Sequence, residues 1–192
     1  DIGQTLLVIF SWAVVIFTSG INIFFLLGFS LFVIVFITYL VIFVPRFDYI
    51  YGRIFSFFNR DSGTHNFQSD KAIESITSGG FFGKGIGEGT LKSRVPEAHT
   101  DYIISVISEE FGVVAIILIL LLFLILIYMV FKKINYEKNE KIKLILIGCV
   151  SLILMQATIH IGVNIRLLPT TGMTLPFLSY GGSSIVSISI LS

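Results

Sequence analysis

The strongest constraint on the fold of this chain is a set of apolar runs, free of charged residues, that are long enough to cross a bilayer. The clearest is VVAIILILLLFLILIYMVF, residues 113–131. About 20 apolar residues cover the hydrocarbon core as a helix, and only helices and closed barrels satisfy the backbone there. Only 13% of the 192 residues are charged, against about a quarter in soluble domains. The sequence therefore predicts an all-α, polytopic integral membrane protein.

Five spans in one membrane domain are predicted. They cover about residues 5–18, 23–44, 102–131, 144–165 and 173–192. The first contains about 14 residues, so it is either a short span or one that extends upstream. Because the chain lacks an initial Met and ends within an apolar run, we expect it to be a fragment with spans missing at one or both ends.

One large polar segment, residues 45–101, separates the second span from the third. It holds seven of the 13 Lys and Arg residues and seven of the 12 Asp and Glu residues, which indicates a folded loop rather than a linker. Within it, residues 67–78 are predicted to form a short helix that ends at Gly79-Gly80. Five lysines in the loop 132–143 predict that this loop is cytoplasmic, so the 45–101 loop is expected on the extracytoplasmic side.

Several functional classes are disfavoured by the sequence. The net charge of +1 argues against a nucleic-acid partner. The lone Cys149 permits no intramolecular disulfide, and His65, His99 and His160 lack the spacing of metal ligands, so no metal site can be named. His160 falls inside a span, where it is expected to be a satisfied core imidazole.

The glycines from Gly79 to Gly89 do not match a nucleotide-binding pattern. Gly79 and Gly83 leave three residues between them where a P-loop has four, and Glu88 stands where a dinucleotide fingerprint needs its third glycine. The glycines are therefore expected to permit a tight turn and a close approach of the backbone to a neighbour. Whether that neighbour is protein or a diphosphate stays open at this point.

Asp101 is the strongest catalytic candidate, because it lies where the extracytoplasmic loop becomes a span. If a helix begins near it, Ser105, Ser108 and Gly112 follow on the same face. That face is small and polar, so it is predicted to contact protein or a cavity and not lipid. The alternative role for Asp101 is to cap the N-terminus of the span helix.

The neighbouring charges suit transfer from a sugar diphosphate. The leaving diphosphate is already a stable anion, so one base for the acceptor hydroxyl and cations for the phosphates suffice. Lys92 and Arg94 are the predicted phosphate contacts. Glu109 and Glu110 lie about 12–14 Å further along the helix, at a depth where an unpaired charge usually marks function. The alternative for these two glutamates is a paired structural role.

A second polar cluster covers residues 164–184, NIRLLPTTGMTLPFLSYGGSS. Irregular backbone at membrane depth is tolerated where it is buried in protein or lines a cavity. The predicted topology places this cluster on the same side as Asp101. The two clusters are therefore predicted to face one cavity.

These two segments resemble the signatures of the SEDS family, the bacterial shape, elongation, division and sporulation proteins. The segment 83–112 is similar to the family's extracytoplasmic loop, with its core at Pro96–Tyr102, and LLPTTGMTLPFLSYGGSS is similar to its other hallmark. Asp1–Thr5 resembles a family entry to a span. Met173–Phe177 is closer to the division member than to the elongation member, whereas His160 and Arg166 depart from the family pattern.

The resemblance implies a multi-pass enzyme of about ten spans in the bacterial inner membrane, of which this chain would be the C-terminal half. The implied reaction is polymerisation of lipid II into glycan strands at the division septum. Implied partners are a class B penicillin-binding protein transpeptidase, other divisome proteins and membrane lipid. The alternatives are a flippase for lipid-linked precursors and a non-catalytic divisome scaffold.

The resemblance also assigns roles to residues. Asp101 matches the proposed base for the acceptor GlcNAc 4-hydroxyl, which attacks the MurNAc anomeric carbon and expels undecaprenyl diphosphate with inversion. No cofactor is certain, although a divalent cation, Mg²⁺ or Mn²⁺, bridging the diphosphate is compatible with this chemistry. The candidate substrate-binding residues are Lys92, Arg94, Glu97, His99, Thr100, Ser105, Glu109, Glu110, Pro176, Ser179, Tyr180, Gly181, Gly182 and Ser183.

Overall fold

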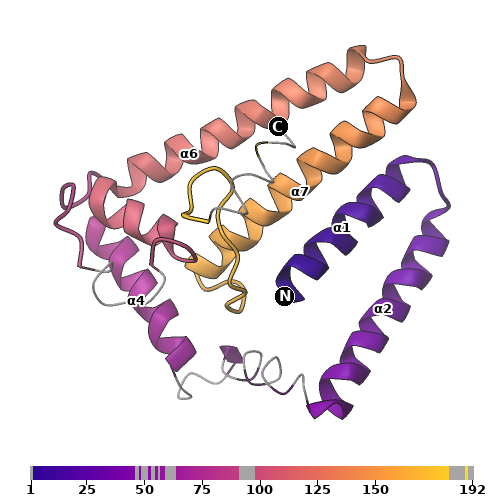
Figure 1. Ribbon diagram of the computed structural model, residues 1–192. Helices are drawn as coiled ribbons and strands as arrows, with labels where there is room; N and C mark the ends of the chain where they lie inside the picture. The colour runs from indigo at the N-terminus through magenta and orange to yellow at the C-terminus, as the bar shows by residue number, and fades with distance from the viewer. Residues whose placement is uncertain are drawn as a thin grey trace.

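Figure 1 shows the protein as a computed structural model. The structure describes residues 2–45, 48, 52, 55, 57–58, 64–90, 98–181 and 189. Its helices are α1 (Ile2–Thr18), α2 (Ile23–Phe43), α4 (Thr64–Gly79), α6 (Ile103–Tyr136) and α7 (Glu140–Asn164). The described residues contain no strand, which confirms the predicted all-α fold. Three helices, α2, α6 and α7, are long and apolar enough to cross a membrane, and α1 is a shorter apolar helix.

The helices run alternately up and down. In Figure 1, α6 and α7 form an antiparallel pair, α1 lies along α7, and α2 follows on the far side of α1. The connections at 19–22 and 137–139 lie at one end, whereas α2 ends, α6 begins and α7 ends at the other. This arrangement agrees with the predicted alternation of spans. The assignment of the 137–139 end to the cytoplasm stays a prediction.

Several boundaries differ from the predicted ones. The predicted loop 132–143 shortens to residues 137–139, because α6 continues to Tyr136 and α7 already begins at Glu140. Lys and Glu are good helix formers, and Asn139 caps α7 by accepting a hydrogen bond from the Lys141 amide at 3.0 Å. In the predicted span 173–192, residues 173–181 are not helical, and 182–188 and 190–192 lie outside the described residues.

The polar segment between α2 and α6 contains the predicted short helix. We expected residues 67–78 to be helical, and α4 covers Thr64–Gly79. The helix ends where the glycine pair was predicted to end it, since Gly80 has a φ of 57°. Figure 1 shows α4 lying across the start of α6.

Small residues bring α1 and α7 close together. Ser11 Oγ donates to the Gly148 carbonyl at 3.1 Å and lies 3.0 Å from Ser151 Oγ. A Cβ at Gly148 would lie 3.1 Å from a methyl group of Val15. Such contacts are typical of helices that pack inside a bilayer.

The main hydrophobic core lies at the end of the bundle where α6 begins. It joins α1, α4, α6, α7 and the segment after α7, and contains Leu7, Ala72, Ala98, Tyr102, Val106, Ile159, Val163 and Met173. The core therefore supports the turn that carries Asp101.

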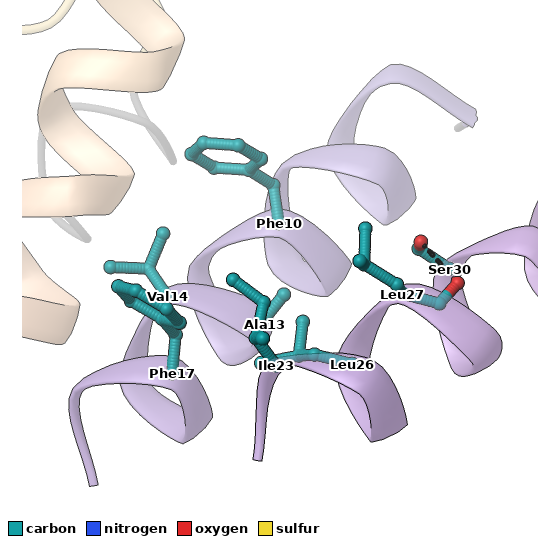
Figure 2. Close-up of a pocket in the computed structure, with 8 residues that line it drawn as sticks. All are labelled: Phe10, Ala13, Val14, Phe17, Ile23, Leu26, Leu27 and Ser30. Carbon is teal, nitrogen blue, oxygen red and sulfur yellow. Dashed lines mark hydrogen bonds between the residues drawn. The ribbon is translucent and has the colours of Figure 1, made fainter. Parts of the chain in front are cut away.

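Helix α2 has no buried residue. An apolar pocket of about 240 Å³ lies between α1 and α2. Figure 2 shows its lining residues: Phe10, Ala13, Val14, Phe17, Ile23, Leu26, Leu27 and Ser30. Its aliphatic and aromatic lining is the surface expected of helices that contact lipid tails.

Candidate active site around Asp101

Asp101 lies in the turn that leads into α6. The N-cap residue of α6 is Tyr102, whose own side chain makes no capping hydrogen bond. Asp101 therefore precedes the N-cap position, which was the alternative role predicted for it. The Asp101 carboxyl is partly buried, and a Cβ at Gly172 would lie 3.8 Å from its Oδ2. The segment after α7 thus passes directly beside the carboxyl group.

The segment after α7 binds the backbone of this turn. The Tyr180 amide donates to the His99 carbonyl at 3.2 Å, and Ser179 Oγ donates to the Thr100 carbonyl at 2.7 Å. Ser179 is buried and its oxygen also accepts from the Leu175 amide at 2.7 Å. The two polar clusters, predicted to lie together, therefore meet through direct hydrogen bonds.

The end of α7 binds the same turn from another side. Asn164 is fully buried, and its Nδ2 donates to the Asp101 carbonyl at 3.0 Å. Its Oδ1 accepts from Ser105 Oγ at 2.8 Å. His160 Nε2 lies 3.4 Å from the Thr100 carbonyl. Three consecutive carbonyls, at 99, 100 and 101, are thus held by groups from residues 160–180.

Sequence reasoning did not place Asn164 and His160 in the site. Asn164 belongs to the second polar cluster but is not among the predicted site residues, and the prediction of a satisfied core imidazole at His160 is confirmed, since its ring is buried and contacts Thr100 and Asn164. The signal that could have found them is two polar side chains four residues apart in an apolar span, which lie on one face of a helix.

The predicted small polar face of α6 contacts protein. Ser105 and Ser108 have no exposed surface, and Gly112 is buried. Ser105 contacts Asn164, and the Ser108 carbonyl lies against Gly79 at the end of α4. The prediction that this face does not contact lipid is confirmed.

Helix α6 is interrupted at Gly112, which has a φ of 78° and a ψ of −175°. A straight helix of 34 residues would be about 51 Å long, well beyond the roughly 30 Å hydrocarbon core. The part from 113 to 136, roughly 36 Å, is long enough to span by itself. The predicted span 102–131 is therefore a short helical segment, 103–111, followed by a break and a spanning helix.

The glycine-rich loop 79–90 binds this break. The Lys84 amide donates to the Glu109 carbonyl at 2.8 Å, and the Gly85 amide donates to the Glu110 carbonyl at 3.1 Å. In return the Val113 amide donates to the Gly80 carbonyl at 3.0 Å. The loop thus replaces the helical hydrogen bonds that the break removes.

Three glycines make this contact sterically possible. A Cβ at Gly79 would lie 2.0 Å from the Ser108 carbonyl oxygen, and one at Gly83 would lie 2.1 Å from that of Glu110. A Cβ at Gly112 would lie 2.2 Å from a backbone oxygen of the same loop. The predicted close backbone approach is confirmed, and the neighbour at these positions is protein backbone.

Glu109 is paired with groups of the same loop. It is 1% exposed, and its Oε1 accepts from Lys84 Nζ at 3.1 Å and from the Thr90 amide at 3.0 Å. Glu110 Oε1 accepts from the Gly87 amide at 3.2 Å. These contacts agree with the alternative of a structural role for both glutamates.

A separate polar cavity of about 240 Å³ lies beside Glu109. It is lined by Lys71, Glu74, Ser75, Ser78, Lys84, Thr90 and Glu109. Asp101 is not among the residues that line it. Among the described residues, the pocket that Glu109 lines is formed by α4, the loop after it and α6.

Some of the remaining candidate residues are described by the structure, and others lie outside the described residues. Pro176 is fully buried, the Tyr180 side chain is 82% exposed, and Gly181 is partly buried. Within the described part of the chain, no three His, Cys, Asp or Glu side chains gather into a metal site. Five further candidates lie outside the described residues: Lys92, Arg94, Glu97, Gly182 and Ser183.

The chain is similar to known proteins in sequence and in fold. A family model described as "Cell cycle protein" (FtsW, RodA, SpoVE) matches residues 1–192. The chain is 34% identical over 194 residues to a probable peptidoglycan glycosyltransferase FtsW of Caulobacter vibrioides, covering 99% of this chain and 48% of that protein. It is 38% identical over 146 residues to a probable peptidoglycan glycosyltransferase FtsW of Enterococcus hirae, covering 74% and 37%.

The chain also matches a solved structure described as "Structural coordination of polymerization and crosslinking by a peptidoglycan synthase complex". The TM-score is 0.75 and the identity 27%, over 100% of this chain and 52% of that one. The chain spans about half the length of the curated relatives it matches.

Proposed function

This chain belongs to the cell cycle protein family of FtsW, RodA and SpoVE, and on that basis we propose that its protein is a peptidoglycan glycosyltransferase. The full-length protein polymerises lipid II into glycan strands at the outer surface of the bacterial inner membrane. The membership confirms the predicted SEDS resemblance, and three helices long enough to span agree with a membrane protein.

The convergence of two distant segments on the Asp101 turn is the observation that carries this proposal. Asp101 is partly buried at the end of the bundle where α6 begins, on a backbone held at three successive carbonyls. Asp101 acts as the general base, which takes the proton of the acceptor 4-hydroxyl as that oxygen attacks the anomeric carbon. The bond to undecaprenyl diphosphate breaks and the configuration inverts. A base already held in position lowers the barrier, because less freedom is lost in the transition state.

The leaving diphosphate needs a cation, and the described cations at this end are engaged elsewhere. They are paired as Lys71 with Glu74, Lys84 with Glu109 and Arg166 with Asp70. Lys92 and Arg94 follow the glycine-rich loop directly and remain the best candidates for the phosphates. A divalent cation, Mg²⁺ or Mn²⁺, is the other source of positive charge.

The partner is proposed from the comparisons. The matched solved structure is described as a peptidoglycan synthase complex that couples polymerisation to crosslinking. We therefore propose that this protein works with a class B penicillin-binding protein, which supplies the transpeptidase. The matched relatives are named FtsW, which favours a place among the divisome proteins at the septum.

The test is polymerisation of lipid II by the full-length protein with its transpeptidase partner in proteoliposomes. Asp101→Asn is expected to lower the rate at least about 100-fold, because the base is lost. The control is Glu88→Gln, which removes one charge from an exposed residue of the same polar segment and is expected to leave the rate within about twofold.

Other outcomes would favour the rival functions. Polymer made by Asp101→Asn at the wild-type rate would remove Asp101 from the mechanism. Translocation of lipid II without polymer would indicate a flippase. Partner binding and normal division that both survive Asp101→Asn would indicate a scaffold.

A further inference from the structure

Asn164, the last residue of α7, uses the whole hydrogen-bonding capacity of its side chain at the Asp101 turn. Nδ2 donates to the Asp101 carbonyl at 3.0 Å and to the His160 carbonyl at 2.9 Å. Oδ1 accepts from the Ser105 amide at 3.2 Å and from Ser105 Oγ at 2.8 Å. A side-chain amide offers two donor hydrogens and two acceptor lone pairs, so every one is satisfied.

The chemistry of the partners sets the orientation of this amide. The Ser105 N–H is only a donor and requires an acceptor, whereas the Asp101 carbonyl is only an acceptor and requires a donor. If the amide turned over, both contacts would become repulsive. Because Asn164 has no exposed surface, bulk water does not reach the amide, and the loss of either contact would leave a buried polar group unsatisfied. The amide therefore fixes the backbone on both sides of the α6 start.

His160 extends this arrangement by one residue. Its Nε2 faces the Thr100 carbonyl, which can only accept, so the ring proton is on Nε2 and Nδ1, 3.3 Å from Asn164 Nδ2, carries none. Nε2 then donates to the Thr100 carbonyl at 3.4 Å. Two residues four apart on α7 thus hold the two peptide groups that flank the Cα of Asp101.

We infer that Asn164 is a positioning residue for Asp101: it sets the direction in which the carboxyl group leaves the backbone. This inference rests on the proposed glycosyl transfer. A carboxylate on a released turn would still be present but would sample other directions. Misplacement of a catalytic group by about 1 Å can cost about 100-fold in rate.

The simpler explanation is that Asn164 only packs α7 against its neighbours. Gln156 offers a matched control on the same helix. Its Nε2 donates to the Thr174 carbonyl at 2.9 Å, so it ties α7 to the same following segment without a contact to the Asp101 turn. A packing effect should appear in both variants, whereas a positioning effect should appear only at Asn164.

The experiment compares Asn164→Leu and Gln156→Leu in the full-length protein with its partner, in proteoliposomes. Asn164→Leu is expected to lower kcat at least about tenfold with KM within about twofold, because binding does not depend on the direction of the base. Gln156→Leu is expected to keep kcat within about twofold. Binding of lipid II, measured in an Asp101→Asn background to prevent turnover, should be the same with and without Asn164→Leu.

The outcomes separate this inference from the proposed function. Wild-type activity, loss in Asp101→Asn and unchanged kcat in Asn164→Leu would overturn the positioning role alone. Equal losses in both leucine variants, or weaker lipid II binding with Asn164→Leu, would also overturn it. If wild type makes no polymer, both proposals fail. Should Asn164→Leu not fold, Asn164→Ser is smaller and carries the same expected loss of kcat.

Discussion

Adding one methyl group at successive glycines of the loop after α4 should separate steric overlap from backbone strain. Gly79→Ala would place a Cβ 2.0 Å from the Ser108 carbonyl oxygen, at a residue without a positive φ. Gly80→Ala would meet nothing within 4 Å, at a φ of 57°. Gly83→Ala combines both, with a Cβ 2.1 Å from the Glu110 oxygen and a φ of 79°.

The magnitudes follow from these contacts. A residue with a Cβ in the left-handed region costs about 1–2 kcal/mol, which is all that Gly80→Ala is expected to lose. Overlap with backbone cannot be relieved by a rotamer, so Gly79→Ala must push the loop off α6. That movement breaks the interlocking backbone hydrogen bonds, each worth about 1 kcal/mol net: Lys84 to Glu109, Gly85 to Glu110, Val113 to Gly80 and Val114 to Phe81. We expect a loss of about 3–4 kcal/mol.

The assay is hydrogen exchange by mass spectrometry on the purified protein in nanodiscs, because it measures local opening of the loop directly. At about 1.4 kcal/mol per tenfold, Gly79→Ala should speed exchange at the Lys84 and Gly85 amides more than about 100-fold. Gly80→Ala should speed it about five- to thirtyfold, and Gly83→Ala at least as much as Gly79→Ala. Equal effects of Gly79→Ala and Gly80→Ala would refute the close-contact explanation.

Two further predictions concern ion pairs. Arg166 has a φ of 59° just after α7 and pairs with Asp70, which is 54% exposed. Both Arg166→Gly and Arg166→Ala lose this exposed ion pair, but only glycine relieves the strain of the positive φ. Arg166→Gly should therefore be up to about 1 kcal/mol more stable than Arg166→Ala in thermal unfolding, and the reverse order would exclude strain at this position. Lys84→Met should destabilise the protein by about 2 kcal/mol, because it removes a cation from the buried Glu109 carboxylate. Adding Glu109→Gln should recover at least half of that loss in thermal unfolding.

Much of the fold could be predicted from hydropathy, because the length and apolar composition of a segment are enough to indicate a span. An uncharged run such as 113–131 is stable in a bilayer as a spanning helix. Local signals also mark where other helices begin and end: Asn22 caps the start of α2, and Pro45 follows the residue that ends it. The meeting of the Asp101 turn with the segment after α7 was also predictable, because alternating spans leave both at the same end of the bundle.

The break at Gly112 could not be predicted from its surroundings. A single glycine in a helix costs only about 1 kcal/mol, so an apolar pattern that continues through it indicates an unbroken helix. What decides the outcome is the loop more than 20 residues earlier, whose amides satisfy the carbonyls of Glu109 and Glu110. The sequence shows glycines in both places, but not that they contact each other.

The break and the Asn164 contacts together determine what positions Asp101. The segment 103–111 is separated from the spanning part of α6 by Gly112, and is bound at one end by the loop after α4 and at the other by Asn164. Ser105 and Ser108, between these ends, face α7 and α4 and are fully buried. Beyond the break, α6 is apolar and mostly exposed, as a lipid-facing helix is. The position of the Asp101 turn therefore depends on α4, α7 and the segment after α7, and not on the α6 span alone.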